Sequence, residues 1–161
     1  MRNMGIYSVL ACLLSLTACI PEQKTPGLIN VSIPVLPSRG HLLVQSAETF
    51  IGTEYRWGGT ERTGIDCSGL IYAAARQAGF AVRRTTTRRM QLDYQDALTP
   101  PLVGDLPLFS HDGKKVAHVG IWKDPEKLLM VHSGSSTGVI VSYLRPKGYW
   151  STRLVVSKKL P

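Results

Sequence analysis

The spacing of apolar residues predicts helices in the first half of the folded part of the chain. In Leu42–Phe50 the apolar positions fall near helical spacing, and Gly52 ends the run. A glycine-broken loop, Tyr55–Gly59, follows this helix. The first predicted element is therefore one helix joined to an irregular segment.

Two further helices are predicted after this loop. The second begins near Cys67, because Asp66 is a good capping residue, and Gly79 ends it. A short third helix follows, with Thr85 or Thr86 as its cap.

After residue 101 the pattern changes to short runs that are rich in β-branched and aromatic residues. The runs predicted to be strands are Asp105–Ser110, Val116–Lys123, Leu128–Ser133, Gly138–Tyr143 and Thr152–Ser157. Because Pro107 lacks a backbone N–H, we expect the first strand to lie at an edge or to be bulged. Helices followed by strands indicate an α+β fold with an antiparallel sheet of about five strands.

The N-terminus has a different pattern. Residues 1–18 contain one basic residue, Arg2, and an apolar run, Ile6–Leu16, that is too short to span a bilayer. This arrangement is typical of a secretory signal peptide. The segment Leu16-Thr17-Ala18-Cys19 resembles the lipobox of bacterial lipoproteins, which implies cleavage before the cysteine and acylation of it. We therefore expect residues 1–18 to be removed and Cys19 to carry lipid.

The segment 19–40 is predicted to be a tether, since prolines recur in it without helical or strand periodicity. This leaves residues 41–161 as the folded domain. Acyl chains on Cys19 would hold the exported protein stably at a membrane. Because Ile20, and not aspartate, follows the cysteine, the lipoprotein resemblance implies the outer membrane, facing the periplasm.

Composition limits the possible partners. The chain has 161 residues with 43% hydrophobic and 19% charged residues, which is typical of one globular domain. Its formal net charge is +8, and such a charge attracts anionic partners. Basic residues cluster only at Arg83, Arg84, Arg88 and Arg89, and no aromatic residue lies among them. We therefore interpret this cluster as a solvated face and expect no nucleic-acid partner.

Three cysteines occur, and no pair has C-x-x-C spacing. Cys12 would leave with the signal peptide and Cys19 would carry lipid, so Cys67 is the thiol left in the mature protein. Its predicted position is the first turn of a helix, where the helix dipole and free N–H groups favour negative charge. We expect these groups to lower the pKa of the thiol and to hold an oxyanion.

Two histidines lie on neighbouring predicted strands. His118 and His132 can lie about 5 Å apart on one face of an antiparallel sheet. A catalytic imidazole needs a partner on its second nitrogen, and His132 is suited to that role. The alternative is two histidines that only help to pack the sheet. A metal site formed with Cys67 is a weak case, and we expect no metal and no cofactor.

Five sequence blocks together resemble the NlpC-type cell-wall peptidases. The blocks are Tyr55-x-Trp57-Gly58-Gly59, Asp66-Cys67-Ser68-Gly69-Leu70-Ile71, Gly104-Asp105-Leu106, His118-Val119-Gly120-Ile121 and His132-Ser133. The resemblance implies a papain-like fold that cleaves peptidoglycan stem peptides through an acyl-enzyme. The scissile bond implied is D-γ-glutamyl–diamino acid, or a cross-link. Cys67 would be the nucleophile, His118 the base and His132 its orienting partner.

The resemblance also implies substrate contacts for Tyr55, Asp66 and Ser68. Aromatic packing explains Tyr55 equally well, and helix capping alone explains Asp66. The implied partners are the stem peptides and, through the lipid on Cys19, a membrane. Two alternatives remain open from the sequence: an amidase or acyltransferase that uses the same triad, and a non-catalytic wall-binding lipoprotein.

Overall fold

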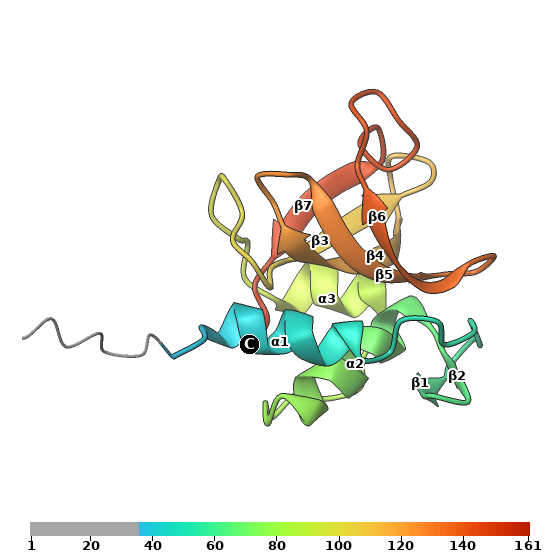
Figure 1. Cartoon of the computed structure of the whole chain (residues 1–161). Helices are drawn as coiled ribbons and strands as arrows, with labels where there is room; N and C mark the ends of the chain where they lie inside the picture. The colour runs from blue at the N-terminus through green and yellow to red at the C-terminus, as the bar shows by residue number, and fades with distance from the viewer. Residues whose placement is uncertain (1–35) are drawn as a thin grey trace, which may run out of the picture. The chain divides into compact units, whose positions relative to one another are not determined.

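The computed structural model describes residues 36–161, so the signal peptide, Cys19 and most of the predicted tether lie outside the described residues. Three helices precede a five-stranded sheet (Figure 1). The helices are α1 (Arg39–Glu48), α2 (Cys67–Gln77) and α3 (Thr87–Asp93). None of the described helices is long and apolar enough to cross a membrane.

Capping side chains explain where the helices begin. The N-caps are Ser38 for α1, Asp66 for α2 and Thr86 for α3, and each accepts a hydrogen bond from a backbone N–H in the first turn. The predicted caps of the second and third helices are confirmed. The first helix begins three residues before the predicted start, because Ser38 caps it ahead of the apolar run.

The sheet has the order β6-β5-β4-β3-β7, and all neighbouring strands are antiparallel. Its strands are β3 (Leu106–Ser110), β4 (Val116–Asp124), β5 (Leu129–Gly134), β6 (Gly138–Tyr143) and β7 (Leu154–Lys158). The predicted α+β class is confirmed, as are the five strands. The sequence pattern did not predict the short hairpin of β1 (Thr60–Glu61) and β2 (Gly64–Ile65).

The strand that contains Pro107 is irregular, but it does not lie at an edge. β7 pairs along its outer side, with Pro107 opposite Ser157, so β3 lies between β7 and β4. The pairing register shifts on both sides of β3, next to Phe109. The prediction that this strand lies at an edge or is bulged is confirmed by the bulge; the strand is not at an edge, because the C-terminal segment pairs along its outer side.

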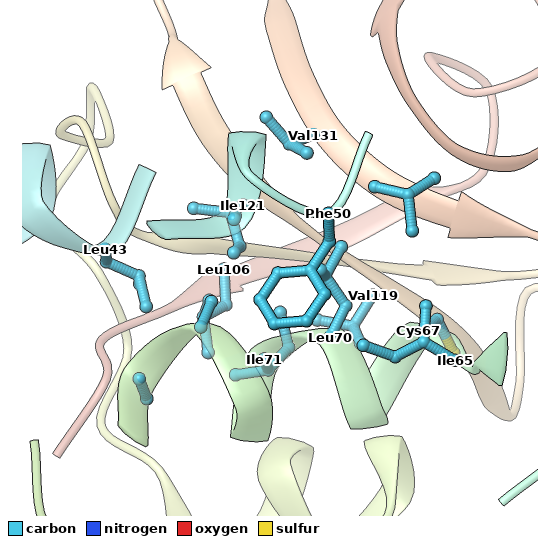
Figure 2. Close-up of a cluster of buried hydrophobic side chains, with 14 of the residues drawn as sticks. Leu43, Phe50, Ile65, Cys67, Leu70, Ile71, Leu106, Val119, Ile121 and Val131 are labelled. Atoms are coloured by element: carbon cyan, nitrogen blue, oxygen red, sulfur yellow. The ribbon is translucent and has the colours of Figure 1, made fainter. Parts of the chain in front are cut away.

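The main core lies between the helices and the sheet. α1 packs on α2, and both α2 and α3 pack on β4 (Figure 1). In Figure 2, Leu70 and Ile71 of α2 lie in one buried cluster with Val119 of β4. Burial of each such side chain stabilises the fold by roughly 1.5–3 kcal/mol. The first turn of α2, with Cys67 in the same cluster, is therefore held against β4.

A second cluster, which contains aromatic side chains, is formed largely by residues of the central strands β3, β4 and β5. Its buried members are Phe109, Trp122, Met130 and Leu144, and the half-buried Trp150 packs against them. Side chains alternate along β4, so His118 shares a face with Trp122 and not with Val119. The histidine thus belongs to the aromatic side of the sheet.

Candidate active site

Cys67 is the first residue of α2 and lines a cleft of about 1030 Å³. Its side chain is buried, with 8% exposed, and its Sγ lies 3.8 Å from the hydroxyl of Thr87. Backbone groups of Val119 and Ser68 lie close enough to the sulfur to lower the pKa of the thiol. Because Val119 directly follows His118, the thiol lies beside the backbone of the strand that carries this histidine.

The carboxylate of Asp66 fixes the start of the helix. It accepts hydrogen bonds from the backbone N–H of Gly69 at 2.5 Å, from the backbone N–H of Gly58 at 2.7 Å and from the hydroxyl of Ser68 at 2.9 Å. Nη2 of Arg84 donates to both carboxylate oxygens, at 3.0 and 3.1 Å, and Nη1 donates to the Ser68 hydroxyl. Asp66 is thus bonded to three separate segments of the chain around Cys67.

The first turn of α2 also needs a residue without a side chain. A Cβ on Gly69 would lie 1.9 Å from the carbonyl oxygen of Gly59. Any other residue at this position would push the loop away from the helix start. Close approach of the two backbones therefore holds the wall of the cleft beside Cys67.

The two histidines form a hydrogen-bonded relay that ends on a hydroxyl. Nε2 of His118 lies 3.0 Å from Nδ1 of His132, and Nε2 of His132 lies 2.8 Å from Oγ of Ser142. His118 and His132 are 8% and 2% exposed. Nε2 of His118 is occupied by this contact, and Nδ1 forms no hydrogen bond among the described residues.

One assignment of the protons makes His118 a base. If His118 carries its proton on Nε2, it donates to Nδ1 of His132, and His132 then donates from Nε2 to Ser142. Nδ1 of His118 is left unprotonated and able to accept the proton of Cys67. In this assignment His132 and Ser142 together fix the tautomer of His118 that leaves Nδ1 unprotonated.

Burial keeps both histidines neutral. It lowers the pKa of His118 to about 3, with further lowering by the neighbouring His132 and His111, and it lowers the pKa of His132 to about 4. The indole ring of Trp150 covers both rings, at centroid distances of 4.7 and 4.9 Å. The relay is therefore a set of neutral rings shielded from water.

The pKa of the Cys67 thiol differs from the value expected from the sequence. Burial raises the pKa of Cys67, and the charge of Asp66 raises it further. Hydrogen bonds from Thr87, Val119 and the N–H of Ser68 at the helix start lower it, but they do so by less than burial raises it. The predicted lowering of the thiol pKa is thus wrong for the substrate-free site, because desolvation of a thiolate outweighs the helix start.

The cleft brings together the residues that the sequence singled out. Cys67, His118 and His132 line it, as do Tyr55, Asp66 and Ser68. Burial raises the pKa of Tyr55, and the charges of Cys67 and Asp66 raise it further, so its phenol lies near Cys67.

The roles of Ser142 and Trp150 in this site were not predicted from the sequence. Ser142 pairs with Met130 on β5, which puts it diagonal to His132, and only the register of the β5–β6 hairpin reveals this. Trp150 lies in the segment between β6 and β7, where no periodicity marks a functional position.

The relay predicts how stability depends on pH. The unfolded histidines have pKa values near 6.5, and the folded values are lower, so the unfolded state binds more protons below pH 6.5. The free energy of unfolding should be highest above pH 6.5 and should fall by roughly 2 kcal/mol per buried histidine between pH 8 and pH 5. Urea unfolding at each pH measures this loss.

Two variants test the source of the pH effect. His132→Gln should remove about half of the loss, because one buried titrating ring is gone. His41→Gln, at an exposed histidine, should keep the wild-type dependence. A wild-type free energy of unfolding that is flat between pH 8 and pH 5 would contradict the neutral relay.

The sequence is similar to several bacterial wall hydrolases. It is 35% identical over 118 residues to the Bacillus subtilis protein named probable peptidoglycan endopeptidase LytE, covering 73% of this chain and 33% of that protein. It is 35% identical over 103 residues to Escherichia coli murein DD-endopeptidase MepS/murein LD-carboxypeptidase, covering 63% and 53%. The chain thus spans about a third to a half of these relatives. The E. coli protein named probable endopeptidase NlpC is 28% identical and is covered over 100% of its length.

Solved structures give the same fold. An NlpC/P60 family protein from Bacillus cereus superposes with a TM-score of 0.65 at 27% identity, covering 76% of this chain and 40% of that one. RipD from Mycobacterium tuberculosis superposes with a TM-score of 0.60 at 19% identity, covering 78% and 100%. RipD is described as a non-catalytic NlpC/p60 domain protein adapted to peptidoglycan binding, and at this identity the likeness shows the fold alone.

The family itself is settled by the extent of the match. The sequence profile of the NlpC/P60 family matches residues 52–159, which is more than half of the chain and includes every residue of the relay and Cys67. The resemblance seen in the sequence blocks is thereby confirmed: this chain belongs to the NlpC/P60 family.

Proposed function

We propose that this protein is a cysteine peptidase that cleaves an amide bond in the stem peptide of peptidoglycan. The bond is D-γ-glutamyl–diamino acid or a cross-link. The observation that carries the proposal is a thiol at a helix start in the same cleft as the His118–His132–Ser142 relay. Relatives named as peptidoglycan endopeptidases support the substrate class.

The geometry supports a mechanism with an acyl-enzyme. Cys67 transfers its proton to Nδ1 of His118, and the thiolate attacks the carbonyl carbon of the scissile bond. The backbone N–H of Cys67 has no carbonyl of its own helix to bond, so it is suited to receive the oxyanion. His118 then gives the proton to the leaving amine, and water hydrolyses the thioester through the same base.

His132 acts on His118 and not on the substrate. In the proton assignment given above, Nδ1 of His132 accepts a hydrogen bond from Nε2 of His118, so it stabilises the imidazolium that forms during proton transfer. Tyr55 and Ser68 are the proposed substrate contacts in the cleft. For Asp66 we propose a role that includes the wall of the substrate site, although its carboxylate is committed to internal hydrogen bonds.

Charge in the cleft fits an anionic peptide. The charged residues lining it are Asp66, Arg84 and Arg88. Asp66 and Arg84 neutralise one another, and among the described residues Arg88 forms no ion pair. A γ-glutamyl linkage leaves the α-carboxylate of the glutamate free, so Arg88 has a counter-charge on the substrate.

The triad is tested by substitution. Cys67→Ala and His118→Ala should each remove nearly all hydrolysis, and the double variant should be little worse, because the two residues act as one unit. His132→Ala should cost roughly 10- to 100-fold, since water can replace part of an orienting partner. Mass spectrometry of digested peptidoglycan identifies the new termini and their rate of appearance.

A matched control is available in the same cleft. His111 lines the cleft but bonds Tyr149 and lies outside the relay, so His111→Ala should keep most of the activity. Hydrolysis that survives Cys67→Ala would refute the mechanism. Peptidoglycan binding without any cleavage by the wild type would favour a non-catalytic wall-binding role.

Recognition by Arg88 is tested by a change of substrate charge. Arg88→Gln should raise KM about fivefold for a stem peptide with a free glutamate α-carboxylate and leave kcat nearly unchanged. With the α-carboxamide peptide, wild type and variant should have the same KM. Arg83→Gln is the control, because Arg83 is exposed and does not line the cleft. An equal increase in KM with both peptides would rule out a contact between Arg88 and the α-carboxylate.

We also propose that lipid on Cys19 anchors the protein in the outer membrane, facing the periplasm, after removal of residues 1–18. Cys19→Ser should abolish incorporation of labelled palmitate and move the protein from the membrane fraction to the soluble fraction. Cys12→Ser, within the segment that is removed, should change neither. Unaltered labelling and fractionation of Cys19→Ser would contradict the anchor.

A further inference from the structure

Trp150 lies face to face with the proposed base. Its ring centroid is 4.7 Å from that of His118, and the two planes are inclined by only 27°. Toward His132 the same indole is nearly perpendicular, at 4.9 Å and 72°. The π face of Trp150 is thus presented to the ring that must become a cation.

Neighbouring aromatic rings hold Trp150 in this orientation. Phe109 contacts it at 5.0 Å and 62°, and Tyr149 at 4.9 Å and 88°. Edge-to-face pairs of this kind favour one orientation of the ring. The stacking on His118 is therefore built into the aromatic cluster and is not a chance position of a loop residue.

The cation formed on His118 has little other support. The relay passes from His118 to neutral His132 and ends on the neutral hydroxyl of Ser142. β3 contributes Phe109 opposite His118, and the nearby His111 disfavours positive charge there. Asp66, the acid that lines the cleft, is neutralised by Arg84. Besides the thiolate and the neutral ring of His132, the described surroundings of His118 offer the π face of an indole.

We propose that Trp150 is an electrostatic and positioning residue of the catalytic relay, whose π face stabilises the His118 imidazolium. That cation arises when the S–H bond of Cys67 breaks and an N–H bond forms at Nδ1. This inference rests on the proposed function, since it needs Cys67 as nucleophile and His118 as base. An aromatic face attracts a desolvated cation electrostatically, and tryptophan is the best of the aromatic side chains for this.

Substitutions separate the π face from simple packing. Trp150→Phe and Trp150→Met both shrink the side chain, but only phenylalanine keeps an aromatic face. Trp150→Met should lower kcat roughly 10- to 30-fold and Trp150→Phe only about threefold, with KM little changed in either. Thermal unfolding of each variant checks that the fold is intact. Equal losses in the two variants would mean that Trp150 only fills space.

Fluorinated tryptophan provides a test that preserves shape. Mono-, di- and trifluorinated tryptophan weaken the π face stepwise, so kcat should fall stepwise in the full-length protein. The same analogues enter Trp57 and Trp122, so Trp150→Phe protein made with each analogue is the control, and its kcat should not respond. Activity independent of fluorination in the wild type would overturn the proposal.

A second readout does not depend on any substrate. The rate of Cys67 alkylation by iodoacetamide at pH 7 reports the thiolate–imidazolium pair, and it should fall with fluorination in parallel with kcat. If Cys67→Ala kept its hydrolytic activity, the proposed function itself would fail. If Cys67 and His118 proved essential while both rates ignored fluorination, only the role of Trp150 would fail.

Discussion

The site depends on one buried carboxylate. Asp66 ties together the loop at Gly58, the first turn of α2 through Gly69, and Arg84 ahead of α3. A buried charge is costly unless it is paired and fully hydrogen-bonded, and here donors from all three segments meet that need. Because the same carboxylate caps α2, the position of Cys67 at the helix start follows from how Asp66 is satisfied.

The second constraint is the register of the central strands. His132 lies opposite Gly120 and not opposite His118, so the two imidazoles meet on a diagonal, with ring centroids 5.0 Å apart. A Cβ on Gly120 would come within 3.0 Å of the Met130 sulfur. The same Cβ would lie 3.4 Å from the Cβ of His132, so a glycine here leaves space beside that histidine, and the hairpin to β6 adds Ser142 to the end of the relay.

Local signals made much of this predictable from the sequence. Caps such as Asp66 and Thr86, and the strand runs of the C-terminal half, depend on neighbouring residues, so their pattern predicted the α+β fold and the histidine pair. Ser142 and Trp150 were missed because their roles arise from register and from a loop that folds back over the sheet. The thiol pKa was predicted in the wrong direction because a helix start is visible in a sequence, whereas the depth of burial is not.

Burial sets the chemistry of the resting site. It raises the pKa of Cys67 and lowers that of His118, so the free site holds a neutral thiol and a neutral imidazole. In the proposed mechanism, proton transfer creates two charges inside a shielded cleft, and each needs a partner that is already in position. Backbone groups of Ser68 and Val119 stabilise the thiolate. His132 and the face of Trp150 stabilise the imidazolium. These partners are already in place without substrate, so the cost of separating charge is offset by fixed dipoles and not by water.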